Sequence, residues 1–202
     1  MTARRSRQRG LAAVEFALLL PILLMLLFGM IDAARALQAN IIITNLSREG
    51  ANLVARGSTQ LETGSQDIIH ALMASAPPLN VNQQGMVYIT RVMGVVKSGV
   101  ATSVVLDQYR WDDAERGLGY GVNQYKPASK VYGCTAWLAG KCSGISSSAR
   151  PVVGLMSGQL ADGEVVFVVE TFYRYDMLLT TAATAALSLP TLGPDLYSFT
   201  VF

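Results

Sequence analysis

The longest apolar segment of the chain lies close to its N-terminus. From Leu11 to Ile31 the sequence is LAAVEFALLLPILLMLLFGMI, 21 residues in which Glu15 is the one charged side chain. A helix rises about 1.5 Å per residue, so a segment of this length can cross the hydrocarbon core of a bilayer. The pattern therefore predicts a membrane-spanning helix, which ends where Asp32 and Arg35 restore charge.

The helical pattern continues past Asp32. Apolar residues such as Ala34, Leu37 and Ile41 recur three or four positions apart, as they do on one face of an amphipathic helix. Gly57 is a suitable stop. We expect one long helix over residues 11–57, the outer half of which packs on a folded domain.

A second, short helix is predicted over Ser65–Ala76. Ser65 can cap its first turn, and Pro77-Pro78 ends it. Its apolar face consists of Ile68, Ile69, Leu72 and Met73. His70, the single histidine of the chain, lies outside that face and is expected to be an ordinary surface residue.

Apolar and β-branched segments in the second half of the chain predict strands. Lys97-Ser98-Gly99 separates the first two and favours a hairpin turn. The predicted strands are residues 86–96, 100–111, 164–178 and 196–202, whereas residues 179–189 remain ambiguous. A long N-terminal helix followed by a small antiparallel β-sheet domain with a short helix makes an α+β fold. That domain is expected over 58–202.

Charge is concentrated at the N-terminus. Residues 1–10 contain four arginines and no acid, while the net charge of the whole chain is +2. The remainder is therefore close to neutral, which argues against a general nucleic-acid-binding role. Arginines before an apolar span hold that end in the cytoplasm, so residues after Asp32 are expected outside it.

Glu15 is the informative residue of the span. A carboxylate inside an apolar helix costs about 2.5–3.5 kcal/mol on insertion scales, unless it lies near the interface and reaches water. A secretory signal peptide with a later cleavage site and a plain single-pass anchor both fit the apolar length. Neither of them accounts for Glu15.

The spacing between Gly10 and Glu15 favours a third interpretation over the signal peptide and the plain anchor. Glu15 and Phe16 are the fifth and sixth residues after Gly10, which follows Arg-Gln-Arg. This arrangement resembles the prepilin leader of type IV filament systems, and the aromatic residue after the glutamate resembles the Flp/Tad (tight adherence) branch. The string GLAAVEFALLLPILLMLLFGMIDAAR is similar to TadE-like pseudopilins, and the resemblance extends to about residue 57.

The resemblance implies a processed, membrane-inserted structural protein. Residues 1–10 would be the leader, cut between Gly10 and Leu11 by a prepilin peptidase. The new α-amine of Leu11 and the carboxylate of Glu15 would then neutralise each other within the lipid layer, in one subunit or between neighbours. Implied partners are other Tad/Flp pilins and pseudopilins, an inner-membrane assembly platform and membrane lipid. The implied location is a bacterial inner membrane, with the C-terminal domain periplasmic or, after assembly, on a pilus at the cell surface.

Cys134 and Cys142 lie close together in a segment rich in Gly and Ser. Their spacing is not a common zinc pattern, and His70 is distant in sequence. A disulfide in an oxidising compartment is favoured over two free thiols. Asp112, Asp113 and Glu115 lack the spacing of a calcium loop and are expected to form a solvated turn. No cofactor or metal site is predicted.

Residues 116–150 contain cationic and aromatic side chains and no acid. Such a combination can bind an anionic surface ligand or a partner subunit, although an ordinary surface loop is favoured. The candidate residues are Arg116, Lys126, Lys130, Trp137, Lys141 and Arg150.

Enzyme motifs are absent from the sequence: we find no phosphate-binding glycine loop, zinc signature or nucleophile elbow. The predicted function is a non-enzymatic minor pilin or pseudopilin that contributes to pilus biogenesis, adhesion or secretion. The rival function is a membrane-tethered adhesin or binding module that uses the 116–150 loop and never enters a filament.

Overall fold

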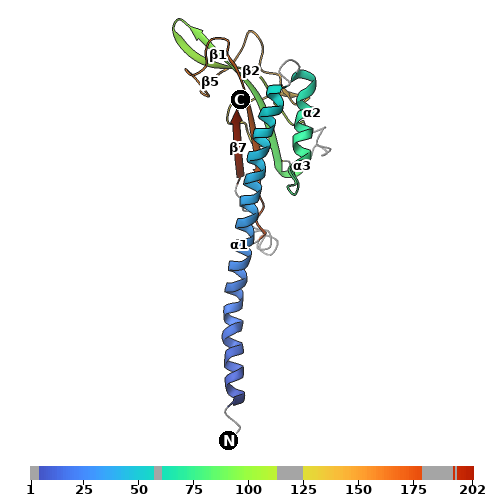
Figure 1. Ribbon diagram of the computed structural model, residues 1–202, viewed down its shortest axis with the longest axis vertical. Coiled ribbons are helices and arrows are strands. Elements are labelled where there is room, and N and C mark those ends of the chain that lie inside the picture. Colours follow the sequence, from blue (N-terminus) through green and yellow to red (C-terminus); the bar gives the residue numbers. More distant parts are fainter. Residues whose placement is uncertain (1–4, 57–60, 113–124, 179–192, 194) are drawn as a thin grey trace. The chain divides into compact units, whose positions relative to one another are not determined.

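The computed structural model describes residues 5–56, 61–112, 125–178, 193 and 195–202 (Figure 1). The helices are α1 (Arg5–Arg56), α2 (Leu61–Ala74) and α3 (Val81–Gln84). The strands are β1 (Gly85–Lys97), β2 (Val100–Arg110), β3 (Trp137–Leu138), β4 (Lys141–Cys142), β5 (Val152–Val153), β6 (Val165–Arg174) and β7 (Asp195–Val201). The chain divides into two compact units, residues 1–38 with 176–194 and residues 39–175 with 195–202.

The long N-terminal helix is confirmed as α1, which is unbroken across Pro21. It is rich in Ala and Leu, which favour helix, and Arg56 in its last turn suits the negative end of the helix dipole. Gly57, the expected stop, lies just outside the described residues.

All the named strands join one antiparallel sheet, in the order β3-β4-β2-β1-β6-β7, with β5 paired to the side of β2. Lys97 pairs with Val100, so Ser98 and Gly99 form a two-residue hairpin loop. Their φ values of 51° and 80° are those that a tight type I′ hairpin turn requires. The hairpin turn predicted at Lys97-Ser98-Gly99 is therefore confirmed.

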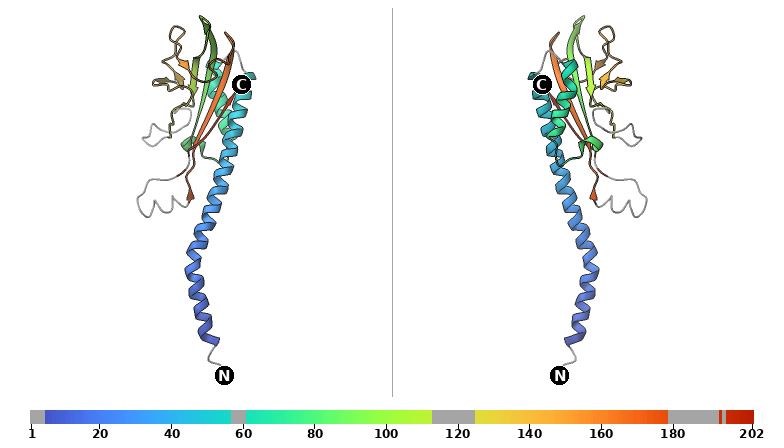
Figure 2. Two further views of the ribbon diagram at one scale, coloured as in Figure 1. Left: turned by 90° about the vertical axis from the view of Figure 1, so that its left-hand side faces the viewer. Right: turned by 90° about the vertical axis from the view of Figure 1, so that its right-hand side faces the viewer.

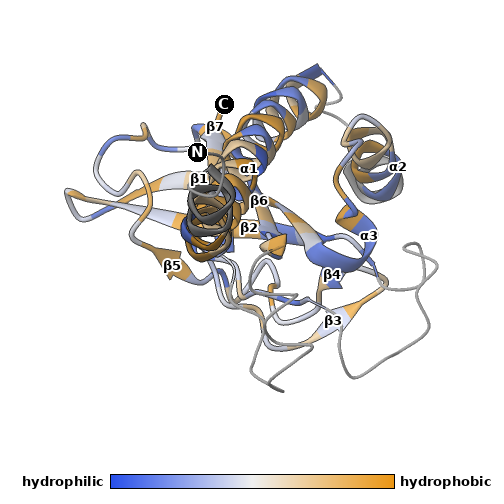
Figure 3. Ribbon diagram, turned by 90° about the horizontal axis from the view of Figure 1, so that it is seen from below, coloured by the Kyte–Doolittle hydropathy of each residue, from blue (hydrophilic) through white to orange (hydrophobic). Residues whose placement is uncertain are grey.

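One face of the sheet, called here the helix face, is covered by α2 and by residues 39–56 of α1 (Figure 2). Ile43 and Val54 of α1 and Ile69 of α2 are fully buried. Gly50 permits the close approach, because a Cβ there would lie 2.9 Å from Leu72 Cδ1 and 3.0 Å from Val169 Cγ1. Figure 3 shows hydrophilic and hydrophobic residues on different sides of α2.

The described loops within residues 125–164 cover the opposite face, called here the loop face (Figure 2). Val92, Val105 and Val168 are fully buried there, in a cluster with Val153, Leu160 and Val166. Both faces of the central strands are thus occupied, which explains why β6 is nearly continuous in apolar residues instead of alternating.

Several boundaries differ from those predicted. Helix α2 begins at Leu61 and contains Ser65, so Ser65 is not its N-cap, and the helix ends at Ala74. Strand β6 ends at Arg174, four residues short of the prediction. On α1, Leu37 and Ile41 are 66% and 61% exposed, because the buried stripe is rotated away from them. That stripe consists of Ala39, Ile43, Leu46, Ala51 and Val54. The ambiguous residues 179–189 lie outside the described residues.

Candidate functional site

The first part of α1 presents an apolar surface on all sides. Leu18, Met25 and Met30 are 70%, 63% and 69% exposed. A helix that is apolar all round and is not covered by other parts of a protein fits a lipid environment or packing against other helices. Among the described residues, α1 is the one helix long and apolar enough to cross a membrane, over Ala12–Arg56. The structure therefore supports the predicted membrane anchor as a candidate.

Glu15 lies in this apolar surface, and it is exposed. Phe16, next to it, is 58% exposed. Gly10 and Leu11 both lie within α1, so Leu11 and Glu15 are four positions apart on a continuous helix. Residues at that spacing lie one turn apart on the same side. A charge generated at Leu11 would therefore be next to the Glu15 carboxylate.

Asp32, predicted to end the apolar run, has a specific partner that sequence reasoning missed. Its side chain is 3% exposed, and Oδ1 accepts a hydrogen bond of 2.8 Å from the backbone N–H of Leu178. Asp32 therefore fixes the start of the 176–194 segment against α1 within their common unit. The sequence indicates this role only weakly, because Asp32 is a single aspartate between the apolar run and the rest of the predicted helix.

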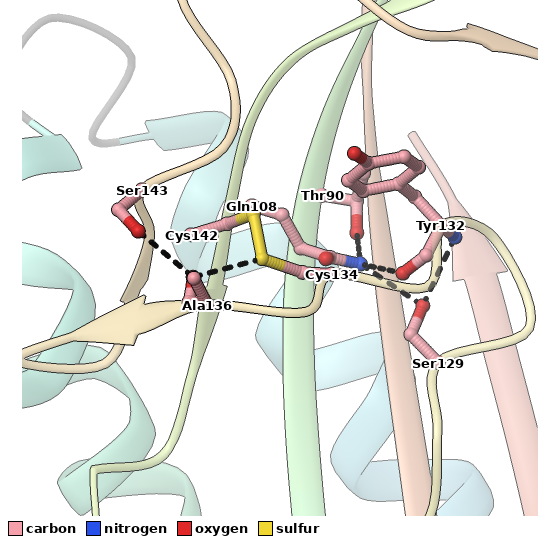
Figure 4. The surroundings of a disulfide bond; sticks show 8 residues. All are labelled: Thr90, Gln108, Ser129, Tyr132, Cys134, Ala136, Cys142 and Ser143. Carbon is pink, nitrogen blue, oxygen red and sulfur yellow. Dashed lines mark hydrogen bonds between the residues drawn. A yellow bond between two sulfur atoms is a disulfide. The ribbon is translucent and has the colours of Figure 1, made fainter.

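Cys134 and Cys142 form a disulfide bond (Figure 4). It closes the short hairpin of β3 and β4, whose turn residues Ala139 and Gly140 both have positive φ. Cys142 is 2% exposed, and the carbonyl of Ala136 accepts hydrogen bonds from the backbone N–H and the hydroxyl of Ser143. The covalent bond and the hydrogen bonds together hold this hairpin beside β2.

Of the candidate cationic residues that the structure describes in the 116–150 segment, Lys141 and Arg150 line one hollow of about 250 Å³, whereas Lys130 lies elsewhere. Lys130 Nζ lies 3.7 Å from the ring centre of Tyr197 on β7, whereas Lys141 Nζ lies 5.6 Å from that of Tyr109 on β2. Two strands, β1 and β6, separate β2 from β7. Lys126 and Arg150 are exposed, and Arg116 lies outside the described residues. Binding of an anionic ligand by this segment stays a prediction.

Trp137 contacts the sheet. Its ring centre lies 5.8 Å from that of Tyr88 and 4.8 Å from the guanidinium carbon of Arg110. The hydroxyl of Tyr88 in turn donates a hydrogen bond of 2.6 Å to the carbonyl of Pro127. These contacts stabilise the segment on the loop face, so its aromatic residues have a structural use whether or not it binds a ligand.

A buried carboxylate, Glu170 of β6, organises the same segment and was not predicted. It is fully buried, and it accepts hydrogen bonds from the hydroxyl of Ser129, from the N–H of Lys130 at 2.9 Å and from the hydroxyl of Tyr197 at 3.1 Å. Burial, followed by the charge of Glu170, raises the pKa of Tyr197 above its ordinary value. Three donors from two separate segments satisfy this carboxylate.

Gln108 extends this polar network from β2 (Figure 4). Its Nε2 donates to Thr90 Oγ1 at 3.1 Å and to both Ser129 Oγ and the carbonyl of Tyr132 at 3.0 Å. In the sequence, Gln108 is noticeable only as a polar residue within an apolar strand, as Glu170 is. The residues that Gln108 contacts are distant from it in sequence.

The remaining titratable candidates do not form a catalytic group. His70 is exposed, and its ring centre lies 6.1 Å from that of Trp111. Asp112 is the last described residue before a gap, so Asp113 and Glu115 lie outside the described residues. Within the described ranges, no three His, Cys, Asp or Glu side chains are close enough together to hold a metal ion.

Comparison with known proteins gives one informative match. Residues 10–52 match the family model described as TadE-like protein. No curated protein and no solved structure matches the chain. The match covers Gly10, Glu15 and the apolar part of α1, and it confirms the TadE-like resemblance over that segment. The matched family is one of structural, non-enzymatic proteins associated with the Tad pilus, and the likeness extends over residues 10–52.

Proposed function

We propose that this TadE-like chain is a minor pilin or pseudopilin, processed and then assembled through the N-terminal part of α1. The observation that carries the proposal is Glu15, a carboxylate in an otherwise apolar helical surface, within the segment that matches the family model. In this proposal, residues 1–10 are the leader, 11–57 the anchoring helix and 58–202 the periplasmic domain.

Cleavage between Gly10 and Leu11 would supply a cation for Glu15, which has no ion-pair partner among the side chains that the structure describes. The four arginines of the leader are removed with it, and the α-amine of Leu11 becomes the positive charge nearest to the carboxylate. An unpaired charge in a lipid or helix-packed layer is costly, so the amine and Glu15, of one subunit or of neighbours, favour one axial register. Processing thereby converts an inserted precursor into a subunit that assembles.

This proposal assigns a location and partners. The N-terminal arginines favour a cytoplasmic N-terminus in the inner membrane, with the sheet domain in the periplasm. The partners are a prepilin peptidase, other Tad/Flp pilins and pseudopilins, and the inner-membrane assembly platform. A periplasmic location agrees with the Cys134–Cys142 disulfide, since such bonds persist in oxidising compartments.

The N-terminal residue of the mature protein tests the proposal. The full chain is expressed with its own processing system, and its N-terminal peptide is identified by mass spectrometry. We expect Leu11 at the N-terminus, and we expect Gly10→Val to retain residues 1–10. Gly29→Val is the matched control, because a Cβ at Gly29 meets no atom within 4 Å, and this variant should be cut normally.

Two other results contradict the proposal. Retention of Met1 in the membrane-inserted protein favours the tethered binding module, which needs no cleavage. A cut near residues 34–39 favours a secretory signal peptide.

A further inference from the structure

The β1–β2 hairpin carries part of the helix face past the end of α1 (Figure 1, Figure 2). Val92 belongs to the loop-face cluster, and a Cβ on Gly94 would meet Leu160 and Ala161. Side chains alternate along a strand, so Met93 and Val95 point to the helix face. The most distal part of that face is left uncovered by α1 and α2.

A hollow of about 510 Å³ lies on this part of the sheet, called here the hairpin hollow. Its floor is apolar and consists of Met93, Val95, Val104 and Val152. Val104 pairs with Met93 on one side and with Val152 on the other, which brings these side chains to one surface. Val152 is 67% exposed, and the neighbouring Val165, which pairs with Met93, is 40% exposed.

The rim of the hairpin hollow is cationic. Lys97 and Arg150 line it and are both exposed, and neither has an ion-pair partner among the described residues. One acid, Asp162, also lines the rim and accepts a hydrogen bond of 2.9 Å from the N–H of Val96, so two cations and one anion leave the rim with a net positive charge. Two cations above exposed valines are an unsatisfied arrangement that favours an anionic and apolar occupant.

We propose that the hairpin hollow binds a peptide segment of a partner protein, with a short apolar centre flanked by carboxylates. The apolar side chains would cover Val95 and Val152, and the carboxylates would contact Lys97 and Arg150. Every part of this surface lies within residues 39–175. The proposal therefore does not depend on cleavage after Gly10, and it applies equally to the uncut precursor.

Three soluble peptides test it against the full chain in nanodiscs of neutral phosphatidylcholine. EELVLEE combines both features, KKLVLKK reverses the charge and EESSSEE removes the apolar centre. Binding is measured by fluorescence anisotropy of an uncharged dye on each peptide. We expect EELVLEE to bind more tightly than the other two, and less tightly as salt rises.

Variants locate the binding. Lys97→Ser with Arg150→Ser should weaken EELVLEE about tenfold, equivalent to about 1.4 kcal/mol. Arg48→Ser with Arg56→Ser is the charge-matched control on exposed positions of α1, and it should change the affinity less than twofold. Val152→Asp should also weaken binding about tenfold, whereas Leu138→Asp, at a position 74% exposed on β3, should not.

Three results overturn the proposal. The first is equal binding of the three peptides, and the second is an equal effect of each variant and its control. The third is binding of phosphatidylglycerol vesicles through Lys97 and Arg150 in place of the peptide. The last result would make the hairpin hollow a lipid-binding surface. Failure of these tests leaves processing after Gly10 unaffected, and failure of processing leaves the peptide measurements unaffected.

Discussion

The hydroxyl of Tyr197 donates a hydrogen bond of 3.1 Å to Glu170, and so joins the edge strand β7 to a fully buried carboxylate on β6. The same carboxylate holds Ser129 and Lys130, and Lys130 covers the Tyr197 ring. Glu170 thus connects the segment that follows Tyr125 with β7, two parts of the chain that have no common strand pairing.

Replacing this carboxylate should loosen both parts. Glu170→Gln puts an amide N–H₂ where an acceptor is needed, so we expect a loss of about 1.5–3 kcal/mol in the free energy of unfolding. Urea denaturation of the full chain in mild detergent measures this loss, and hydrogen exchange should accelerate over residues 126–132. Asp67→Asn, an exposed position on α2, is the control. An unchanged urea midpoint for Glu170→Gln would contradict a stabilising role.

The raised pKa of Tyr197 predicts a loss of stability in alkali. Burial and the charge of Glu170 disfavour the phenolate in the folded state, so the folded pKa lies above the unfolded value of about 10. The unfolded state therefore releases its proton first as pH rises. The stabilising contribution is complete below about pH 10 and falls progressively above it.

Tyr197→Phe should weaken this alkaline dependence. Thermal unfolding measured between pH 8 and about 11 should fall less steeply for the variant than for the unmodified protein. The variant should also be less stable at pH 8, by about 0.5–1.5 kcal/mol, because one hydrogen bond is lost. Tyr132→Phe is the control, because the Tyr132 hydroxyl makes no hydrogen bond with Glu170, and this variant should retain the original slope of stability against pH. Identical slopes for all three proteins would refute the assignment to Tyr197.

The disulfide should contribute to stability by restricting the unfolded chain. For a separation of 8 residues between Cys134 and Cys142, the chain-entropy model gives about 2–3 kcal/mol. The double variant Cys134→Ser with Cys142→Ser should lose about this amount in urea denaturation. Non-reducing peptide mapping should find the two peptides joined, and alkylation of both thiols in the folded protein would rule the bond out.

Glu15 should separate processing from assembly. Glu15→Gln retains the shape of the side chain and the whole leader, so insertion and cleavage should proceed normally. Incorporation into pilin complexes should decrease, because the amine of Leu11 then has no charged partner. Glu15→Leu should insert at least as well and assemble no better. Co-purification with other pilins at the original level for both variants would mean that the carboxylate does not set the register.

The long elements could be predicted because their signals are local. Apolar periodicity predicted α1, and β1 and β2 were placed to within one residue because Ser98-Gly99 is itself a turn sequence. The start of α2 was misplaced because Ser65 was read as its N-cap, yet the helix begins at Leu61 and continues through Gly64. One glycine costs only about 1 kcal/mol in a helix, which packing can offset.

The contacts of Glu170 could not be predicted because they depend on residues far apart in sequence. A glutamate within EVVFVVETF is noticeable, but nothing local indicates that Ser129 and Tyr197 will reach it. Similarly, β3, β4 and β5 have two residues each, too few for a period to be recognised. Their positions follow from pairing with β2, a tertiary property.

The position of β1 between β2 and β6 has a consequence for synthesis. Its hairpin partner β2 follows directly in the sequence, whereas its other partner β6 is synthesised much later, as the pairing of Gly85 with Tyr173 shows. Strand β6 in turn pairs with β7, which is synthesised later still. While the chain is being made, one edge of β1 therefore remains open until most of the domain has appeared. Open edges invite pairing with the wrong chain, and distant partners delay closure. The incomplete domain is therefore prone to aggregate with other newly made copies of the chain. A low rate of synthesis and translocation would reduce that aggregation.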